Sequence, residues 1–159
     1  GGYRRSVIEE LLPVRMIEGD DRVNWPYPCV VETSAPHPIT AGLPFETPPC
    51  IGGYNRFLPD GKSTVVLRAA RYKTGSGEAP ELRRAAEPEP LLVVRDSGTF
   101  RVAALATDAA PHWVGGLVDW GPADDRFCAQ APGAEAIEVG RWYATFFAQM
   151  VRWAAGGTG

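Results

Sequence analysis

Residues 91–106 read LLVVRDSGTFRVAALA, and this stretch decides the class of fold. The apolar runs 91–94 and 100–106 lie on either side of the turn Asp96-Ser97-Gly98. Two apolar runs separated by a short turn that contains glycine are typical of a β-hairpin. We therefore predict two antiparallel strands here, and hence a domain that contains a β-sheet.

Two helices are predicted, one near each end of the chain. Ser6 and Glu9 have the spacing of a capping box, in which each side chain accepts a hydrogen bond from the other residue's backbone, so a helix should follow over residues 7–12. Further on, apolar residues recur at spacings of three and four, which predicts an amphipathic helix over residues 136–155 that Gly156 ends. Its apolar stripe, expected to pack in the core, consists of Val139, Trp142, Tyr143, Phe146, Phe147, Met150, Val151 and Ala154.

Between these elements the sequence indicates strands and loops. The β-branched run Thr64-Val65-Val66 predicts a strand over residues 63–72, and residues 14–17 are compatible with a short one. Residues 24–50 contain seven prolines, which remove backbone donors, so we expect an irregular excursion over the surface. Residues 73–90, with Gly-Ser-Gly and Glu-Pro steps, are predicted to form a loop.

The composition describes one folded domain and disfavours several classes of partner. With 159 residues, a 45% hydrophobic fraction and five tryptophans, the chain can bury a single core, so we expect one domain over residues 1–159. A net charge of −3 and a pI near 5.4 give no attraction for nucleic acid or anionic lipid. The apolar runs are shorter than a membrane span and no export signal is visible, so a cytoplasmic location is expected.

The three cysteines, Cys29, Cys50 and Cys128, are expected to be unreactive. Their odd number and wide spacing favour neither disulfides nor a CxxC metal site. Each lies in an apolar setting, which raises the thiol pKa and favours burial. A metal site built from His37, His112 and a cysteine has no helical ligand pair to support it, so we expect neither a metal nor a cofactor.

Three segments, in a fixed order, resemble one protein family. They are His37-Pro38-Ile39-Thr40-Ala41-Gly42-Leu43-Pro44, then Gly53-Tyr54-Asn55-Arg56, then the stretch from Gly98 through Val102 to Asp108-Ala109-Ala110-Pro111-His112-Trp113. The ordered set is similar to class I glutamine amidotransferase-like proteins of unknown function, akin to the trehalose-utilisation type. The helix with Trp142 and Trp153 also fits, so the resemblance covers most of the chain.

The resemblance implies an α/β domain with a flavodoxin-like, doubly wound sheet. In the family, several βα units precede a Gly-Gly-Tyr segment, and here Gly1-Gly2-Tyr3 is the first segment of the sequence. By that comparison we expect residues 1–159 to be a partial glutamine amidotransferase-like domain without the N-terminal strands of the family.

The amidotransferase machinery is not found at the matching positions. The family mechanism needs a cysteine on a strained turn and a histidine that a glutamate orients. By the resemblance that turn is Gly1-Gly2-Tyr3, which has no cysteine, and neither His37 nor His112 begins a His-x-Glu motif. We therefore expect no hydrolysis of glutamine by this mechanism.

The resemblance also points to a candidate ligand site, because ligands of open α/β sheets gather at the carboxyl ends of strands. The candidate binding residues are Gly2, Tyr3, Asn55 and Arg56, and the candidate catalytic residues are His112 and Asp108. Asn55 and Arg56 suit a carboxylate or a sugar hydroxyl, although an ion pair of Arg56 is the alternative. Likewise Asp108 could cap a turn and His112 could have a structural place. His37, which precedes a proline, is expected to bond the turn that follows it.

Two functions are compatible with these residues. The first is a non-catalytic module that holds a small polar or anionic molecule, within a homo-oligomer or against a partner chain that covers Trp25, Tyr27 and Phe45. The second is an enzyme that uses His112 and Asp108 as general acid and base on a carbohydrate or an amide. A hydrogen bond between His112 and Asp108 inside a pocket would favour the enzyme, and the missing cysteine favours the binding module.

Overall fold

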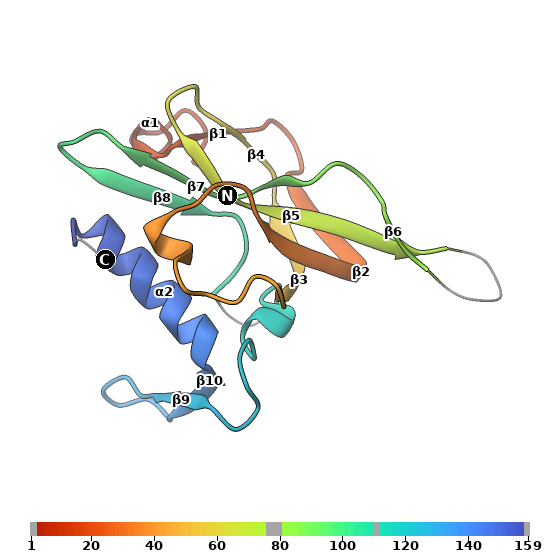
Figure 1. Ribbon diagram of the computed structural model, residues 1–159. Helices are drawn as coiled ribbons and strands as arrows, with labels where there is room; N and C mark the ends of the chain where they lie inside the picture. The colour runs from red at the N-terminus through yellow and green to blue at the C-terminus, as the bar shows by residue number, and fades with distance from the viewer. Residues whose placement is uncertain (1–2, 76–80, 110–111, 158–159) are drawn as a thin grey trace.

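The computed structural model describes residues 3–75, 81–109 and 112–157 (Figure 1). Within these residues the chain forms one six-stranded sheet, two small two-stranded sheets, two α-helices and two short 3-10 helices. Every strand pair in this part of the chain is antiparallel. The chain is therefore a mixed α/β domain in which antiparallel sheet dominates.

The main sheet has the strand order β3-β2-β5-β7-β8, and β6 pairs with one end of β5. Its strands are β2 (Arg22–Thr33), β3 (Cys50–Asn55), β5 (Thr64–Thr74), β6 (Leu82–Arg84), β7 (Glu89–Asp96) and β8 (Arg101–Leu105). The small sheets pair β1 (Val14–Met16) with β4 (Phe57–Pro59), and β9 (Arg126–Ala129) with β10 (Ile137–Gly140). The helices are α1 (Val7–Leu11), α2 (Arg141–Ala154), η1 (Pro38–Thr40) and η2 (Gly115–Leu117).

The described residues do not confirm the flavodoxin-like, doubly wound arrangement. A doubly wound sheet consists of mostly parallel strands that helices connect across both faces. Here consecutive strands of the main sheet are joined by turns and loops, and one long helix, α2, comes after all of them (Figure 1). The α/β class is confirmed at the coarser level of a mixed domain.

The predicted hairpin is confirmed as β7 and β8. Asp96 pairs with Arg101 at its closed end, and the backbone N–H of Ser97 donates to the carbonyl of Phe100 across the turn (3.1 Å). Gly98 has a φ of 81°, in the left-handed region that glycine adopts without strain. The strand predicted at residues 63–72 is also confirmed, and it continues to Thr74 in β5.

The expectation that residues 24–50 form no regular strand is wrong for the first part of that range. Residues 22–33 form β2, the longest strand described, although Pro26 and Pro28 lie within it. The pairing of β2 with β3 is interrupted between Asn24 and Cys29, and its pairing with β5 begins only at Cys29. The two prolines therefore lie where no ladder hydrogen bond is required, so their missing N–H groups cost little.

The predicted loop at residues 73–90 is also partly wrong. Lys73 and Thr74 continue β5 and pair with Arg83 and Leu82 of β6, and β7 begins at Glu89. This two-stranded extension projects from the body of the domain (Figure 1). Sequence reasoning missed it because β6 is three residues long and exposed, so it has no apolar alternation.

The two predicted helices exist with shorter bounds. The Ser6 side chain accepts a hydrogen bond from the N–H of Glu9, as predicted, but the Glu9 carboxylate accepts from the N–H groups of Arg5 and Met16 instead of Ser6. The second helix begins at Arg141, because residues 137–140 form β10. Val139 therefore belongs to a strand, although it is buried as expected. Gly156, with a φ of 85°, ends the helix.

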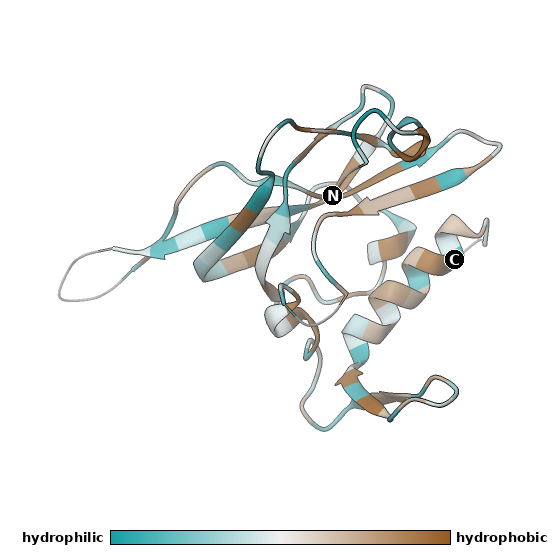
Figure 2. Cartoon of the chain, turned by 180° about the vertical axis from the view of Figure 1, so that it is seen from behind, coloured by the Kyte–Doolittle hydropathy of each residue, from teal (hydrophilic) through white to brown (hydrophobic). Residues whose placement is uncertain are grey.

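The core lies between the main sheet and α2. Figure 2 shows hydrophobic residues along the helix, which lies beside the sheet. Phe146 and Trp153 of α2 are buried, together with Trp120 and the strand residues Val31, Leu67 and Leu92. Phe146 is 2% exposed. The aromatic residues of the predicted stripe thus pack in the core, as the periodicity predicted. The prediction is wrong at the end of the helix, where Val151 and Ala154 are exposed and Trp153, which the stripe did not include, is buried.

The aromatic side chains expected to remain for a partner are mostly covered within the chain. The indole N–H of Trp25 donates to the carbonyl of Tyr72 (2.8 Å), and Trp25 packs against the core. Phe45 lies against Trp120, with 4.9 Å between ring centroids. Tyr27 is exposed. The Pro-rich segment therefore buries most of its own aromatic surface.

Candidate functional site

Four of the predicted site residues line one cavity of about 410 Å³: Tyr3, Asn55, Arg56 and Asp108. We call it the Arg56 cavity. Asp21 and Thr107 add polar groups, and its apolar wall comes from α1, β1 and β8, for example Ile8, Val14 and Ala104. Residues from five separate segments of the sequence thus meet at one place.

The cavity forms where the two edge strands of the main sheet, β3 and β8, come together. They are at opposite ends of the strand order. Nevertheless, the N–H of Asn55 at the end of β3 donates to the carbonyl of Ala106, just after β8 (2.8 Å). The Thr107 hydroxyl also donates to the carbonyl of Gly53 (2.9 Å). The sheet therefore curls until its edges meet, and this closure places Asn55 and Arg56 beside Thr107 and Asp108.

Asp21 holds the Asn55–Arg56 pair in position. Its carboxylate accepts from the Asn55 side-chain amide (2.9 Å), and its backbone carbonyl accepts from the N–H of Arg56 (2.7 Å). Asp21 is half-buried and immediately precedes β2. Sequence reasoning missed it because it lies in a polar turn, and only the pairing of Arg22 with Asn55 shows that this turn lies next to Arg56.

Arg56 provides the available positive charge of the cavity. Its side chain is exposed, and within the described residues its guanidinium makes no ion pair or side-chain hydrogen bond. The ion pair that was the alternative for this residue is therefore not formed there. Its charge also acts on Asp20: hydrogen bonds from Arg22, with a smaller contribution from Arg56, lower the pKa of Asp20 to about 2.

Asp108 has a structural hydrogen bond in addition to its place in the cavity. One carboxylate oxygen accepts from the N–H of Trp113 (3.1 Å), which closes the loop after β8. Trp113 in turn donates its indole N–H to the Asn24 side chain (2.8 Å). The capping role considered for Asp108 is thus observed, and its other carboxylate oxygen has no hydrogen-bond partner among the described residues.

His112 is not brought to the cavity. Its side chain is exposed, and it is not among the residues that line the Arg56 cavity. No hydrogen bond joins His112 to Asp108 among the residues that the structure describes. Gly2, the remaining predicted residue, lies outside the described residues. The pair of His112 and Asp108 therefore has no acid–base geometry in this conformation.

His37 has the structural role expected of it. Its Nδ1 accepts from the N–H of Ile39 (3.2 Å) and thereby caps η1. Its ring lies edge-on against Trp153, with 5.0 Å between centroids. Sequence reasoning therefore predicted the capping function of His37, but not its contact with α2.

The cysteines lie apart from the Arg56 cavity. Cys29 is buried, and burial raises its pKa to about 12, so this thiol stays protonated at neutral pH. Burial also raises the pKa of Cys50. Cys128 is exposed on β9, so the expectation of burial is wrong there, because that two-stranded hairpin leaves one face uncovered. In the described part of the chain no group of three or more His, Cys, Asp or Glu side chains is arranged to hold a metal ion.

The fold and the site define a mixed α/β domain with a polar cavity where the sheet edges meet. The sequence model of the family GATase1_like, "Putative glutamine amidotransferase", matches residues 1–128. The chain therefore belongs to this glutamine amidotransferase-like family, as its motifs predicted. No curated protein matches the chain. None of the helices in the described residues is long and apolar enough to span a membrane.

Two of the solved structures that are similar to the chain are cytoplasmic proteins by name. Cytoplasmic Protein STM3548 from Salmonella typhimurium has a TM-score of 0.64 and 24% sequence identity, over 96% of this chain and 47% of its own chain. Cytoplasmic Protein STM1381 from Salmonella typhimurium LT2 has a TM-score of 0.53 and 29% identity, over 70% of this chain and 38% of its own. The chain thus spans less than half the length of either protein, and at such identity the first of them supports the fold alone.

Proposed function

We propose that this chain binds a small polar or anionic molecule in the Arg56 cavity, without the glutamine chemistry of its family name. The observation that carries the proposal is the guanidinium of Arg56, which has no partner among the described residues, at a cavity that also contains Asn55 and Asp108. A planar guanidinium without a direct ion pair is suited to bind a carboxylate or a phosphate through two parallel hydrogen bonds.

The remaining polar groups suit hydroxyl or amide groups of the same ligand. Asn55 uses its side-chain N–H on Asp21, so its carbonyl oxygen can accept a hydrogen bond. Asp108 retains one carboxylate oxygen after its bond to Trp113. The apolar wall of Val14, Ile8 and Ala104 lowers the exposure of these groups to water and so strengthens their hydrogen bonds.

The change Arg56→Ala should weaken the binding of a small anion about tenfold or more, because a hydrogen bond to a charged group contributes roughly 1.5–3 kcal/mol. The measurement is an NMR titration of the chain with inorganic phosphate, succinate and glucose. We expect the signals of residues 55–56 and 103–108 to shift with at least one of these probes.

The control for this experiment is Arg83→Ala, which removes the same charge from the exposed strand β6. It should leave the affinity unchanged. Equal losses in both variants would mean that only the net charge of the chain matters. If none of the three probes shifts the cavity signals, the proposed site is contradicted.

The enzyme reading, with His112 and Asp108 as acid and base, is the second candidate. It has less support, because a general acid and base must lie within hydrogen-bond reach of a shared substrate. His112 is exposed and outside the lining of the cavity that contains Asp108. We therefore favour the binding module.

This chain should release no ammonia from glutamine above background, because its cysteines lie outside the Arg56 cavity and the resemblance assigns no nucleophile to Tyr3. A coupled assay for ammonia and glutamate measures this directly. Glutaminase activity that disappears on Cys128→Ser, the change at the exposed thiol, would refute the prediction. The matched comparison is Cys29→Ser, the same change at the buried thiol.

Three further properties belong to the same proposal. We propose a cytoplasmic location, which the names of the two similar structures support. We also propose a homo-oligomer or a partner chain, because Val7, Leu11, Phe127 and Ile137 are exposed apolar side chains. The flavodoxin-like, doubly wound sheet stays a prediction of the family resemblance.

A further inference from the structure

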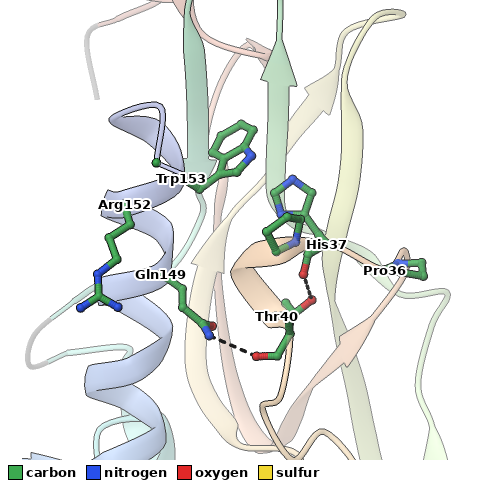
Figure 3. Close-up of a pocket in the computed structure, with 9 residues that line it drawn as sticks. Pro36, His37, Thr40, Gln149, Arg152 and Trp153 are labelled. Carbon is green, nitrogen blue, oxygen red and sulfur yellow. Dashed lines mark hydrogen bonds between the residues drawn. The ribbon is translucent and has the colours of Figure 1, made fainter. Parts of the chain in front are cut away.

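A second and larger cavity lies between the segment around η1 and the last turns of α2. It has a volume of about 840 Å³ and shares no lining residue with the Arg56 cavity. One wall contains Pro36, Pro38 and Ala41, and the other contains Gln149, Arg152 and Trp153 (Figure 3). We call it the α2 cleft. Its second wall lies beyond residues 1–128, which the family model matches.

The two walls are fixed to each other by interactions that cross the cleft. The Gln149 side-chain N–H donates to the carbonyl of Ala41 (3.1 Å), as Figure 3 shows. The His37 ring lies against Trp153, which is buried. Because hydrogen bonding and aromatic packing both join the walls, the cleft is a preformed feature, and a ligand would not have to open it.

His37 can donate a hydrogen bond into the cleft. Its Nδ1 accepts from the N–H of Ile39, so the proton of the neutral ring is on Nε2. Burial, and to a smaller extent the charge of Arg101, lower the pKa of His37, which keeps the ring neutral and this tautomer in place at neutral pH. Nε2 has no hydrogen-bond partner among the described residues, although His37 lines the cleft.

The charge of the cleft is positive. Arg152 lines it, and its guanidinium makes no ion pair within the described residues, whereas no Asp or Glu is among the lining side chains. In Figure 3 the Arg152 side chain lies at the outer rim, away from Trp153. The partial negative charge at the C-terminal end of α2 is compensated within the chain. The Arg101 guanidinium donates to the carbonyls of Trp153 and Gly157, and the N–H of Gly156 donates to the carbonyl of Trp153.

The remaining lining is mostly apolar, and the polar side chains of Thr40 and Gln149 within it donate to the carbonyls of His37 and Ala41. Pro36, Pro38, Ala41 and Trp153 present rings or small apolar groups, and the volume of the cleft falls within the range of about 300–1,000 Å³ typical of small-molecule sites. Apolar walls with few polar groups fit a ligand whose body is apolar and whose polar group is at one end. The donors His37 and Arg152 favour an acceptor as this polar group, and among the described residues no carboxylate lines the cleft, which favours a negative one. The Gln149 side-chain oxygen, which is buried without a partner in the described residues, is a lining acceptor that a ligand N–H or O–H could reach.

We propose that the α2 cleft binds a small organic anion with a flat apolar body, such as an aromatic carboxylate. The apolar body lies between the proline wall and α2, its carboxylate accepts from Nε2 of His37, and the charge of Arg152 at the rim attracts it. This site is independent of the Arg56 cavity, so either can be occupied without the other.

The test uses benzoate as the probe, with benzamide as its neutral counterpart and acetate as the anion without a ring. In an NMR titration of the chain, benzoate should shift the signals of residues 36–41 and 149–157 and bind at least about fivefold more tightly than either of the others, since both the charge and the apolar body contribute. Failure of the Arg56 cavity to bind phosphate or succinate would not affect this result.

Two substitutions locate the binding groups. His37→Asn removes the Nε2 donor while its side-chain oxygen can still cap the N–H of Ile39, and Arg152→Gln removes the exposed charge. His37→Asn should weaken benzoate binding about three- to tenfold, because it removes a hydrogen bond to a charged group. Arg152→Gln should cause a smaller loss of about two- to threefold, because it removes an exposed attracting charge. Arg83→Gln, the same change on β6, should have no effect.

Several outcomes would overturn the proposal. Benzamide binding as tightly as benzoate would show that the cleft does not recognise charge. Shifts at residues 55–56 and 103–108 instead of the cleft would place the anion elsewhere, and unchanged affinity in both cleft variants would exclude the assigned donors. A chain that binds none of the three probes would also refute it.

Discussion

Replacing Gly53 with alanine should lower the free energy of unfolding by about 3 kcal/mol, near the upper end of overpacking costs. A Cβ atom at Gly53 would lie 2.5 Å from the backbone carbonyl oxygen of Val23 and 2.7 Å from the indole of Trp113. Neither neighbour can move easily, because the first belongs to the paired strand β2 and the second is bonded to Asn24.

The measurement is thermal unfolding followed by circular dichroism. For a chain of this size each kcal/mol corresponds to about 2–4 °C, so the midpoint should fall by roughly 6–12 °C. The neighbouring change Gly52→Ala is the matched control, because its Cβ would make only ordinary contacts of 3.6 Å or more. Both residues are in β3, and neither has a positive φ. Similar losses in the two variants would show that the close approach of Trp113 is not the cause.

The same position connects stability to the candidate site. The carbonyl of Gly53 accepts from the Thr107 hydroxyl, and the N–H of Asn55 donates to the carbonyl of Ala106. A side chain at Gly53 would push the segment after β8 away from β3 and so open the closure that forms the Arg56 cavity. We therefore infer that the small residue in the family motif Gly53-Tyr54-Asn55-Arg56 is required for the sheet edges to meet.

The local elements could be predicted from the sequence where one pattern dominated. The hairpin of β7 and β8 has two apolar runs around Gly98, and α2 has an apolar stripe sustained over most of its length. These signals depend only on neighbouring residues. By contrast, β2 contains two prolines whose cost depends on which partner strand faces them, and β10 replaces the expected first turn of α2 because it pairs with β9. Pairing of that kind is not visible in one segment alone.

The candidate site could be predicted only in part, for the same reason. Tyr3, Asn55, Arg56 and Asp108 were grouped by the family resemblance, and they do line one cavity. Asp21 was missed because its contact with Asn55 spans 34 positions of the sequence. His112 was included because it follows the end of a strand. The hydrogen bond between Asp108 and Trp113 closes the loop in which His112 lies, and the His112 side chain is exposed to solvent. The position of a residue after a strand predicts that its backbone lies near the cavity. Whether its side chain points into the cavity depends on the conformation of the loop.

The α2 cleft was missed entirely for a related reason. His37 was correctly interpreted as the cap of η1, and the aromatic residues in the stripe of α2 were correctly interpreted as core packing. Each interpretation concerns one element, whereas the cleft exists only because η1 and the last turns of α2 lie side by side. A residue can therefore have a structural role through one atom, here Nδ1, and offer another atom, Nε2, to a ligand.

Phe146→Ala is the second change with a large expected effect, a loss of about 4 kcal/mol in the free energy of unfolding, because truncating a buried phenylalanine removes its apolar contacts and leaves a cavity. Phe146 is 2% exposed, lies edge-on against Phe147 with 5.3 Å between centroids, and lines a small apolar void beside Leu67, Leu91 and Trp120. These three neighbours are themselves buried in the core, so they have little freedom to move into the space that the ring leaves. The thermal midpoint should fall by roughly 8–16 °C.

Val151→Ala is the control on the same helix. Val151 is 65% exposed, and alanine has the higher helix propensity, so that variant should be neutral or slightly more stable. If both variants unfolded alike, α2 would not be anchored to the sheet through Phe146, and the α2 cleft would lose the rigid wall that its ligand needs.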